Sequence, residues 1–252
     1  GRALRAGGSL YVDVIDRKPP LPFAAYAAFG TEHLQLIRLV VALLVLGAGW
    51  LCADEARRRW GAHAGWAAGL ILVLGAAALG PADAQAANFE LFALLPIVVA
   101  VVAAARGRAA VAGVALAVAV LCKQPAAVTI LPVGWSWWVT RRWRGVGIGL
   151  ASGAVTGVVL AAPFGLGNVI EWALLGTGGY LAFDPADIGF LAVRVVAVVA
   201  IAAGFWGGAW LLLIGGRAGG RDGADGAASS VAATDHQTDL DLWLLFWGSL
   251  LG

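Results

Sequence analysis

The chain has 252 residues, of which 61% are hydrophobic and only 13% are charged, and its formal net charge is +2. About a quarter of the residues in an average soluble domain are charged, so this composition predicts an integral membrane protein. The small net charge argues against a nucleic-acid partner, because such proteins carry strongly basic surfaces. The sequence starts at Gly1, contains no methionine and stops inside the apolar run LWLLFWGSLLG, so we expect a piece of a longer protein, truncated at both ends.

Apolar stretches separated by short polar segments predict an all-α, polytopic transmembrane helical bundle. A helix needs about 20 mostly apolar residues to cross a bilayer. The candidate spans are 34–53, 63–80, 89–105, 109–122, 125–139, 145–163, 189–213 and a truncated one from 241. The fourth and fifth spans are short, and they could instead form one long helix.

The distribution of charge favours a turn at Lys123 over one long helix. With that turn, the arginine-rich loops all fall on one side of the membrane, which is cytoplasmic by the positive-inside rule. These loops hold Arg57, Arg58, Arg59, Arg106, Arg108, Arg141, Arg142, Arg144, Arg217 and Arg221. Lys18 and Lys123, the two lysines of the chain, then share the external side. Without the turn, arginine-rich loops would alternate between sides.

Three segments are not predicted to span the membrane. PPLPFAAYAAFG, residues 19–30, is too short and starts with prolines, so we expect an external helix lying at the interface. Residues 164–188 are expected to be external and to include a similar helix. Residues 214–240 are rich in Gly, Ala, Ser and Asp, which predicts a disordered cytoplasmic linker. The domains are therefore a transmembrane domain over 1–213, this linker, and the start of a further span at 241–252.

Charged and polar residues of the external side form the candidate site. Lys18 lies in the first loop, YVDVIDRKPPLPF, Asn88 and Glu90 lie at the start of the third span, and Lys123 lies at the fourth-to-fifth turn. Acids and lysines that meet at a membrane rim are typical of a site for an anionic lipid headgroup. Each residue also has a structural interpretation: Lys123 extends to the interface, Asn88 caps a helix, and Glu90 complements the helix dipole.

Other chemistries are not indicated. The three histidines are scattered over different parts of the predicted topology, and Cys52 and Cys122 fall at opposite membrane faces, so we expect no metal site and no disulfide between them. The glycines of GVGIGLASG recur at helical spacing in an apolar span, which favours close helix packing over phosphate binding. The sequence indicates no cofactor, and it leaves open whether the protein needs a divalent cation.

The ordered motifs GGSLYVDVIDRKPPL, AANFELF and GVALAVAVLCKQPA, separated by apolar spans, resemble the GT-C superfamily of membrane glycosyltransferases. They are most similar to its protein mannosyltransferase and aminoarabinose transferase branch, and the resemblance covers residues 7–130. It implies transfer of a sugar from a polyprenyl-phosphate donor. It also implies that Lys18 and Lys123 contact the lipid phosphate, that Asn88 or Glu90 lines the cavity, and that a first-loop acid is the catalytic base.

The resemblance does not assign the catalytic base to one residue of this chain. The acidic pair of the family usually lies upstream of the LYVD element, before Gly1, so Asp13 and Asp16 are either auxiliary residues or the base itself. We expect a multi-pass protein of the bacterial plasma membrane whose external site transfers the sugar to a protein, a glycan or a lipid. Two alternatives stay open, namely a transporter or lipid flippase, and a non-catalytic lipid-binding relative.

Overall fold

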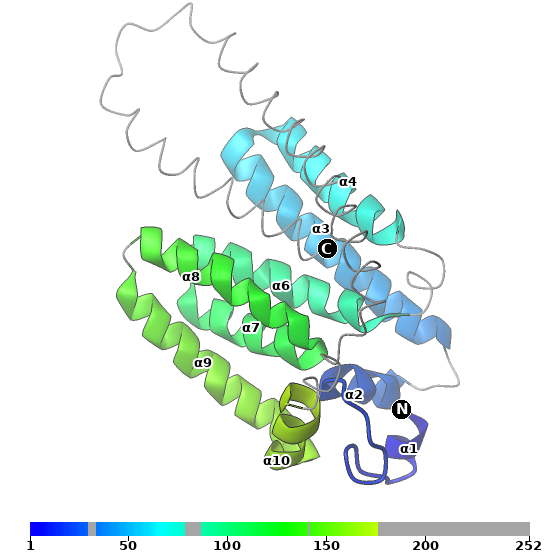
Figure 1. Ribbon diagram of the computed structural model, residues 1–252. Helices are drawn as coiled ribbons and strands as arrows, with labels where there is room; N and C mark the ends of the chain where they lie inside the picture. The colour runs from blue at the N-terminus through cyan, green and yellow to red at the C-terminus, as the bar shows by residue number, and fades with distance from the viewer. Residues whose placement is uncertain (30–33, 79–86, 141, 176–252) are drawn as a thin grey trace, which may run out of the picture. The chain divides into compact units, whose positions relative to one another are not determined.

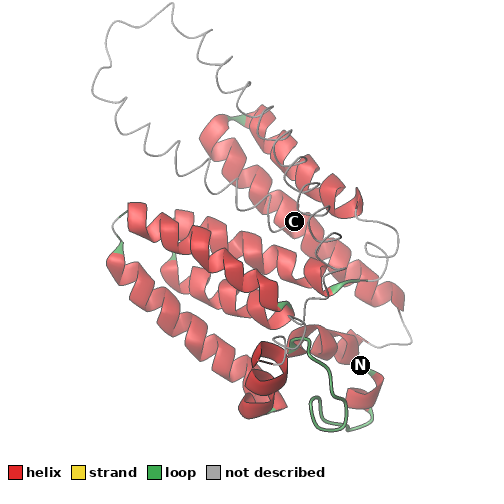
Figure 2. Ribbon diagram, in the orientation of Figure 1, coloured by secondary structure: helices red, strands yellow, loops and turns green. Residues whose placement is uncertain are grey.

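The computed structural model describes residues 1–29, 34–78, 87–140 and 142–175, which all belong to one compact unit within residues 1–179. The regular elements of these ranges are helices, and an isolated bridge joins Leu10 to Val14 in the first loop (Figure 2). The predicted all-α class is therefore confirmed for this part of the chain. The predicted span 189–213, the linker 214–240 and the segment from 241 lie outside the described residues.

Figure 1 shows the helices of the described ranges, labelled in chain order. The longer ones are α2 (Pro20–Phe29), α3 (Leu34–Trp60), α4 (Ala62–Ala78), α6 (Phe89–Ala105), α7 (Ala109–Cys122), α8 (Ile130–Val139) and α9 (Trp143–Ala161). The short ones are α1 (Arg2–Arg5), the 3-10 helices η1 (Gln124–Thr129) and η2 (Ala162–Phe164), α10 (Leu166–Asn168) and the π-helix η3 (Val169–Leu175). Helices α6 and α7 have the predicted bounds, and the helix predicted within 19–30 is present as α2, whose location at the membrane interface stays a prediction.

Helix α3 continues to Trp60, seven residues beyond the predicted end at 53. Its last turns carry acids and arginines that pair along the helix: Arg57 and Arg58 with Asp54, and Arg59 with Glu55. Pairs at these spacings support a helix, and arginines at its C-terminal end also complement the helix dipole. The apolar run therefore ends before the helix does.

The predicted turn at Lys123 is confirmed. Helix α7 ends at Cys122, and Lys123 has extended backbone angles, φ −155° and ψ 126°. Pro125 then lies in the first turn of η1, where it cannot continue the hydrogen bonding of α7. The predicted span 125–139 is therefore divided into the 3-10 helix η1 and the shorter helix α8.

Neighbouring helices pack in the order α4, α3, α6, α7 and α9 (Figure 1), and α8 packs against α6 and α9. Helices α7 and α9 approach closely because small residues face each other: a Cβ on Gly113 would overlap the carbonyl oxygen of Gly149. Ser152 also donates a hydrogen bond of 3.0 Å across this contact to the carbonyl of Ala110. Gly149 and Gly153 of GVGIGLASG thus take part in the close packing that the sequence predicts, whereas Gly147 faces open space.

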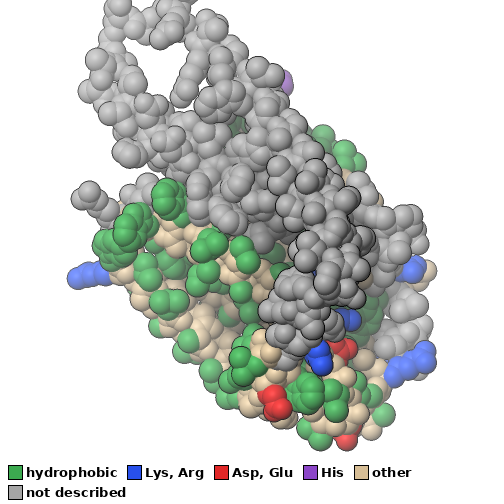
Figure 3. All heavy atoms as spheres, in the orientation of Figure 1, with side chains coloured by type: hydrophobic (Ala, Val, Ile, Leu, Met, Phe, Trp, Pro, Cys, Tyr) green, Lys and Arg blue, Asp and Glu red, His purple; other side chains and the backbone are tan. Residues whose placement is uncertain are grey.

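Two helices of the described ranges are long and apolar enough to cross a membrane, Gln35–Trp60 and Trp143–Phe164. Only 22% and 11% of their most apolar stretches are buried, whereas a core helix of a soluble protein is mostly buried. Hydrophobic side chains accordingly spread over the visible face of the described helices (Figure 3). Helices α4, α6 and α7 are apolar but shorter.

Candidate functional site

A cavity of about 190 Å³ lies where the end of the first loop, the start of α6 and the α7–η1 turn meet. The four residues predicted to bind substrate all line it: Lys18, Asn88, Glu90 and Lys123. Pro19, Phe89 and Gln124 complete its lining. The structure thus brings together residues from three separate segments of the chain, including both lysines.

Lys123 and Glu90 form an ion pair within this cavity. Both side chains are partly exposed, so the pair adds little to stability, and its main consequence is to orient the ammonium group of Lys123. Glu90 lies in the first turn of α6, where a carboxylate is also favoured by the helix dipole. Asn88 takes the N-cap position of α6, but its side chain makes no capping hydrogen bond. The capping interpretation of the Asn88 side chain is therefore wrong.

The ammonium group of Lys18 lies 5.3 Å from the centre of the Phe89 ring. Phe23 of α2 packs edge-on against the same ring, with 5.2 Å between the ring centres. A cation near the face of an aromatic ring is attracted by the electrons of that face. Phe89, which sequence reasoning missed, therefore helps to hold Lys18 near the start of α6.

Tyr11 fixes the backbone of the first loop beside this lysine. Its hydroxyl donates a hydrogen bond of 2.7 Å to the carbonyl of Lys18, and its side chain is buried. Burial raises the pKa of Tyr11, and the nearby Asp16 carboxylate adds to this effect, so the hydroxyl keeps its proton. Tyr11 also has a φ of +69°, which is uncommon for a residue with a side chain and often marks a functional region.

Gln124 connects the cavity to two distant segments. Its side-chain nitrogen donates hydrogen bonds of 2.6 Å to the carbonyl of Arg17 and of 2.9 Å to the carbonyl of Ala173. One amide therefore links the first loop, the α7–η1 turn and the π-helix η3. Nothing in the local sequence of CKQP signals these contacts, which is why sequence reasoning missed Gln124.

Asp13 and Asp16, the predicted catalytic acids, do not line the cavity. The Asp13 carboxylate accepts a hydrogen bond of 2.7 Å from the backbone N–H of Ser9, and the Asp16 carboxylate accepts one of 3.1 Å from that of Lys18. Such short-range contacts stabilise turns. Each aspartate thus has a role in shaping the first loop, and a role in catalysis stays a prediction.

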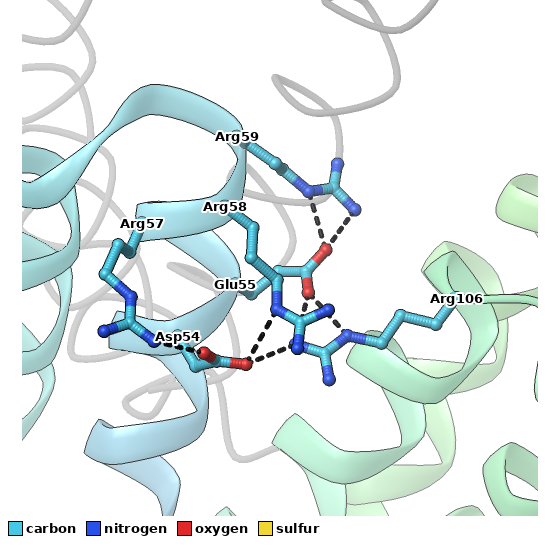
Figure 4. Close-up of polar contacts among 6 residues, drawn as sticks. All are labelled: Asp54, Glu55, Arg57, Arg58, Arg59 and Arg106. Atoms are coloured by element: carbon cyan, nitrogen blue, oxygen red, sulfur yellow. Dashed lines mark hydrogen bonds and ion pairs between the residues drawn. The ribbon is translucent and has the colours of Figure 1, made fainter.

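A second group of charges ties α3 to the opposite end of α6 (Figure 4). Arg106 donates hydrogen bonds of 2.7 Å to Glu55 and 2.9 Å to Asp54. Burial lowers the pKa of Arg106, but these hydrogen bonds outweigh it and hold the pKa above its usual value. Helix α6 has 17 residues and is therefore about 25 Å long, which separates this group from Glu90 at its start. Asp54 and Glu55 were not among the functional residues predicted from the sequence.

The two ammonium groups and the side-chain amide of Asn88 suit an anionic ligand of the size of a phosphate group. Glu90 is paired with Lys123, and the side-chain nitrogen of Gln124 donates to two backbone carbonyls, so these two groups shape the cavity without adding donors to it. No protein family, no curated protein and no solved structure matches this chain. The function of the cavity must therefore be argued from its own residues.

Proposed function

We propose that this protein is a membrane glycosyltransferase that moves a sugar from a polyprenyl-phosphate donor to an acceptor on the external face of the membrane. The observation that supports it most directly is the cavity that both lysines of the chain line, together with Asn88 and Glu90. Two lysines far apart in an otherwise arginine-based sequence lie at one small polar cavity. This is the arrangement expected if both contact one phosphate.

The chemistry requires a cationic site for the departing phosphate. A hydroxyl or amine of the acceptor attacks the anomeric carbon of the sugar, the bond from that carbon to the phosphate oxygen breaks, and negative charge grows on the phosphate. Lys18 and Lys123 stabilise this charge as compact point charges. A carboxylate accepts the proton of the acceptor. Glu90 is the carboxylate among the described residues that lines the cavity.

The proposed setting is a multi-pass protein of the bacterial plasma membrane. The exposed apolar surfaces of α3 and α9 support insertion into lipid. The charges support an orientation, because both lysines line one cavity while Arg106 and the arginines that end α3 are joined at the other end of α6. The positive-inside rule makes the arginine end cytoplasmic and the lysine end external. A protein, a glycan or a lipid is the acceptor.

Replacing each lysine tests the proposal. In the full-length protein, Lys18→Ala and Lys123→Ala should each lower sugar transfer from the polyprenyl-phosphate donor by about 10- to 1000-fold, the range seen when one charge-stabilising donor is removed. Arg57→Ala is a matched control, because it removes an exposed cation at the opposite end of α6. Transfer at the wild-type rate by both lysine variants would rule the proposal out.

One observation favours a second candidate, a non-catalytic protein that binds lipid phosphates. The carboxylate of Glu90 is held in an ion pair with Lys123, and those of Asp13 and Asp16 accept backbone hydrogen bonds, so each of these candidate bases is already engaged. Under this alternative, wild-type protein binds the donor lipid in a lysine-dependent way and transfers no sugar to any acceptor. Measuring donor binding and transfer on the same preparation separates the two candidates.

A further inference from the structure

A second, larger cavity of about 720 Å³ lies between the α6–α7 loop and the start of α9. Its lining includes Arg108, Arg142 and Arg144, together with the apolar residues Val111, Trp143 and Ile148. Helices α7 and α9 both begin at this cavity, next to Arg108 and Arg142 respectively. It lies at the arginine-rich end of the described helices, so it is separate from the cavity of Lys18 and Lys123.

The lining of this cavity is positively charged and contains no acid. Within the described ranges, none of the ion pairs involves Arg108, Arg142 or Arg144, in contrast to Arg106, which is held by Asp54 and Glu55. The first N–H groups of α7 and α9 also receive no side-chain cap, and the positive ends of both helix dipoles lie beside the cavity. Three guanidinium groups and two helix starts therefore all favour an anion here.

Local contacts position Arg142 beside the α6–α7 loop. The guanidinium of Arg142 lies over Gly107, whose φ of +73° and missing Cβ allow the approach, since a Cβ there would overlap it. The backbone N–H of Arg142 donates a hydrogen bond of 2.9 Å to the carbonyl of Trp137. The Trp137 side chain is buried, and its indole N–H has no partner among the described residues. It lies close to Gly145 of the cavity lining: a Cβ added to that glycine would stand 3.8 Å from the Cδ1 atom of Trp137.

The surroundings of the cavity are apolar and exposed. Trp143, Val111 and Ile148 all present large hydrophobic side chains to the surface, and Trp138 packs edge-on against Trp143 with 5.0 Å between ring centres. Beyond them, the outer face of α9 exposes further apolar residues, including Leu150 and Val155. A ligand that fits both parts has an anionic head and a hydrocarbon tail. Tryptophans at the ends of apolar helices, such as Trp138 and Trp143, are typical of the membrane interface.

We propose that this cavity binds the phosphate headgroup of an anionic phospholipid of the cytoplasmic leaflet, with its acyl chains along the apolar face of α9. Basic pockets between helices on the cytoplasmic side are suited to such headgroups. Arginine supports the assignment, because its planar guanidinium can make two hydrogen bonds to one phosphate. The inference rests on the proposed membrane location of the protein and is independent of the proposed transfer reaction.

The test counts bound lipids on the detergent-solubilised full chain by native mass spectrometry. The probes are dioctanoyl phosphatidylglycerol, dioctanoyl phosphatidylcholine and inorganic phosphate. The double variant Arg142→Gln/Arg144→Gln is compared with Arg57→Gln/Arg58→Gln, which removes the same charge from exposed arginines at the same end of the described helices. Both pairs are also measured in the Lys18→Ala/Lys123→Ala background, which removes the cations of the other cavity and keeps the outcome separate from that of the transfer assay.

We expect phosphatidylglycerol binding to weaken on the order of fivefold for each arginine of the cavity that is replaced, and to change little in the control pair. Phosphatidylcholine should bind weakly and without dependence on the arginines. If the double variant does not fold, the single variants Arg142→Gln and Arg144→Gln answer the same question. Equal losses in both pairs, unchanged binding in the cavity variants, or displacement of the lipid by millimolar inorganic phosphate would each overturn the proposal.

Discussion

The hydroxyl of Tyr11 donates a hydrogen bond of 2.7 Å to the backbone carbonyl of Lys18, and so fixes the loop that carries one of the two lysines. Removing this hydroxyl should displace Lys18 without emptying the space that the Tyr11 ring fills. Tyr11→Phe should therefore raise the KM for the polyprenyl-phosphate donor about fivefold, the effect of one hydrogen bond worth about 1 kcal/mol. The free energy of unfolding should fall by no more than about 1 kcal/mol, as for the loss of any single hydrogen bond.

Thr140→Val is the matched control for Tyr11→Phe. It also removes a hydroxyl that donates to a backbone carbonyl, that of Ser136, but at the far end of α8. If both variants raise the KM equally, the effect of Tyr11 is a general loss of stability. The proposed positioning of Lys18 would then be wrong.

The two lysines should act on the same phosphate. The double variant Lys18→Ala/Lys123→Ala should lose less transfer activity than the product of the two single losses, because a phosphate that has lost one of its two contacts is held less well in reach of the other lysine. Lysine-to-arginine variants should recover only part of the activity, since the guanidinium group is larger and differently hydrated. Steady-state rates over a range of donor concentrations measure both effects. Fully multiplicative losses would indicate two separate binding sites.

Glu90→Gln separates binding from proton transfer. Loss of the negative charge frees Lys123 from its ion pair, so donor binding should stay equal or become tighter. Transfer should nevertheless fall by about 100-fold or more if Glu90 accepts the proton of the acceptor. Asp13→Asn serves as the comparison, because Asp13 lies outside the cavity. A larger loss of transfer in Asp13→Asn than in Glu90→Gln would assign the base to the first loop.

The ion pairs between α3 and α6 should matter for stability and not for the proposed reaction. Arg106 has a side chain that is 21% exposed and pairs with Asp54 and Glu55, whereas the Arg58 side chain is 62% exposed. Arg106→Gln should lower the melting temperature by about 2 to 8 °C, and Arg58→Gln by less, because only the first leaves two partly buried acids without their shared partner. Thermal unfolding in detergent checks this order, and equal shifts would contradict it.

Close packing of α7 and α9 can be tested with two glycines. Gly113→Ala adds a methyl group where it would overlap the carbonyl of Gly149, so we expect a loss of about 1–3 kcal/mol of unfolding free energy. Gly147→Ala adds the same group to open space on α9, where alanine should stabilise the helix by about 0.5–1 kcal/mol. Unfolding of both variants in one detergent gives the comparison. Stabilisation by Gly113→Ala would show that α7 and α9 lie further apart.

Local patterns in the sequence predicted the bounds of the helices more accurately than they predicted the contacts between helices. Helices α6 and α7 have their predicted bounds because apolar runs end there at arginines or at Lys123. The end of α3 was predicted too early, because the apolar run ends at Asp54 and Glu55. In the structure these two acids pair with the arginines of the last helical turn, and the helix continues. Pairing at these spacings is visible in the sequence and could have corrected the error.

The membership of the candidate site was predictable only in part. Lys18, Asn88, Glu90 and Lys123 stand out as polar residues at the ends of apolar runs, and the predicted topology already put them on one side. Phe89 and Gln124 carry no such signal, because an aromatic residue in an apolar helix usually serves packing and an amide beside a proline usually serves a turn. Their roles come from partners that lie far away in sequence.

The double hydrogen bond of Gln124 has a consequence for the order in which the protein can be built. Its two acceptors, on Arg17 and Ala173, leave the ribosome far apart in time. At synthesis rates of about 5–20 residues per second, the first loop exists for on the order of ten seconds before Ala173 has been made. Gln124 follows Arg17 by 107 residues and precedes Ala173 by 49, so it can hold the loop only in the last part of that interval, when it still lacks its second anchor. The lysine cavity is therefore completed late in translation, after α7, α8 and α9 have all been synthesised.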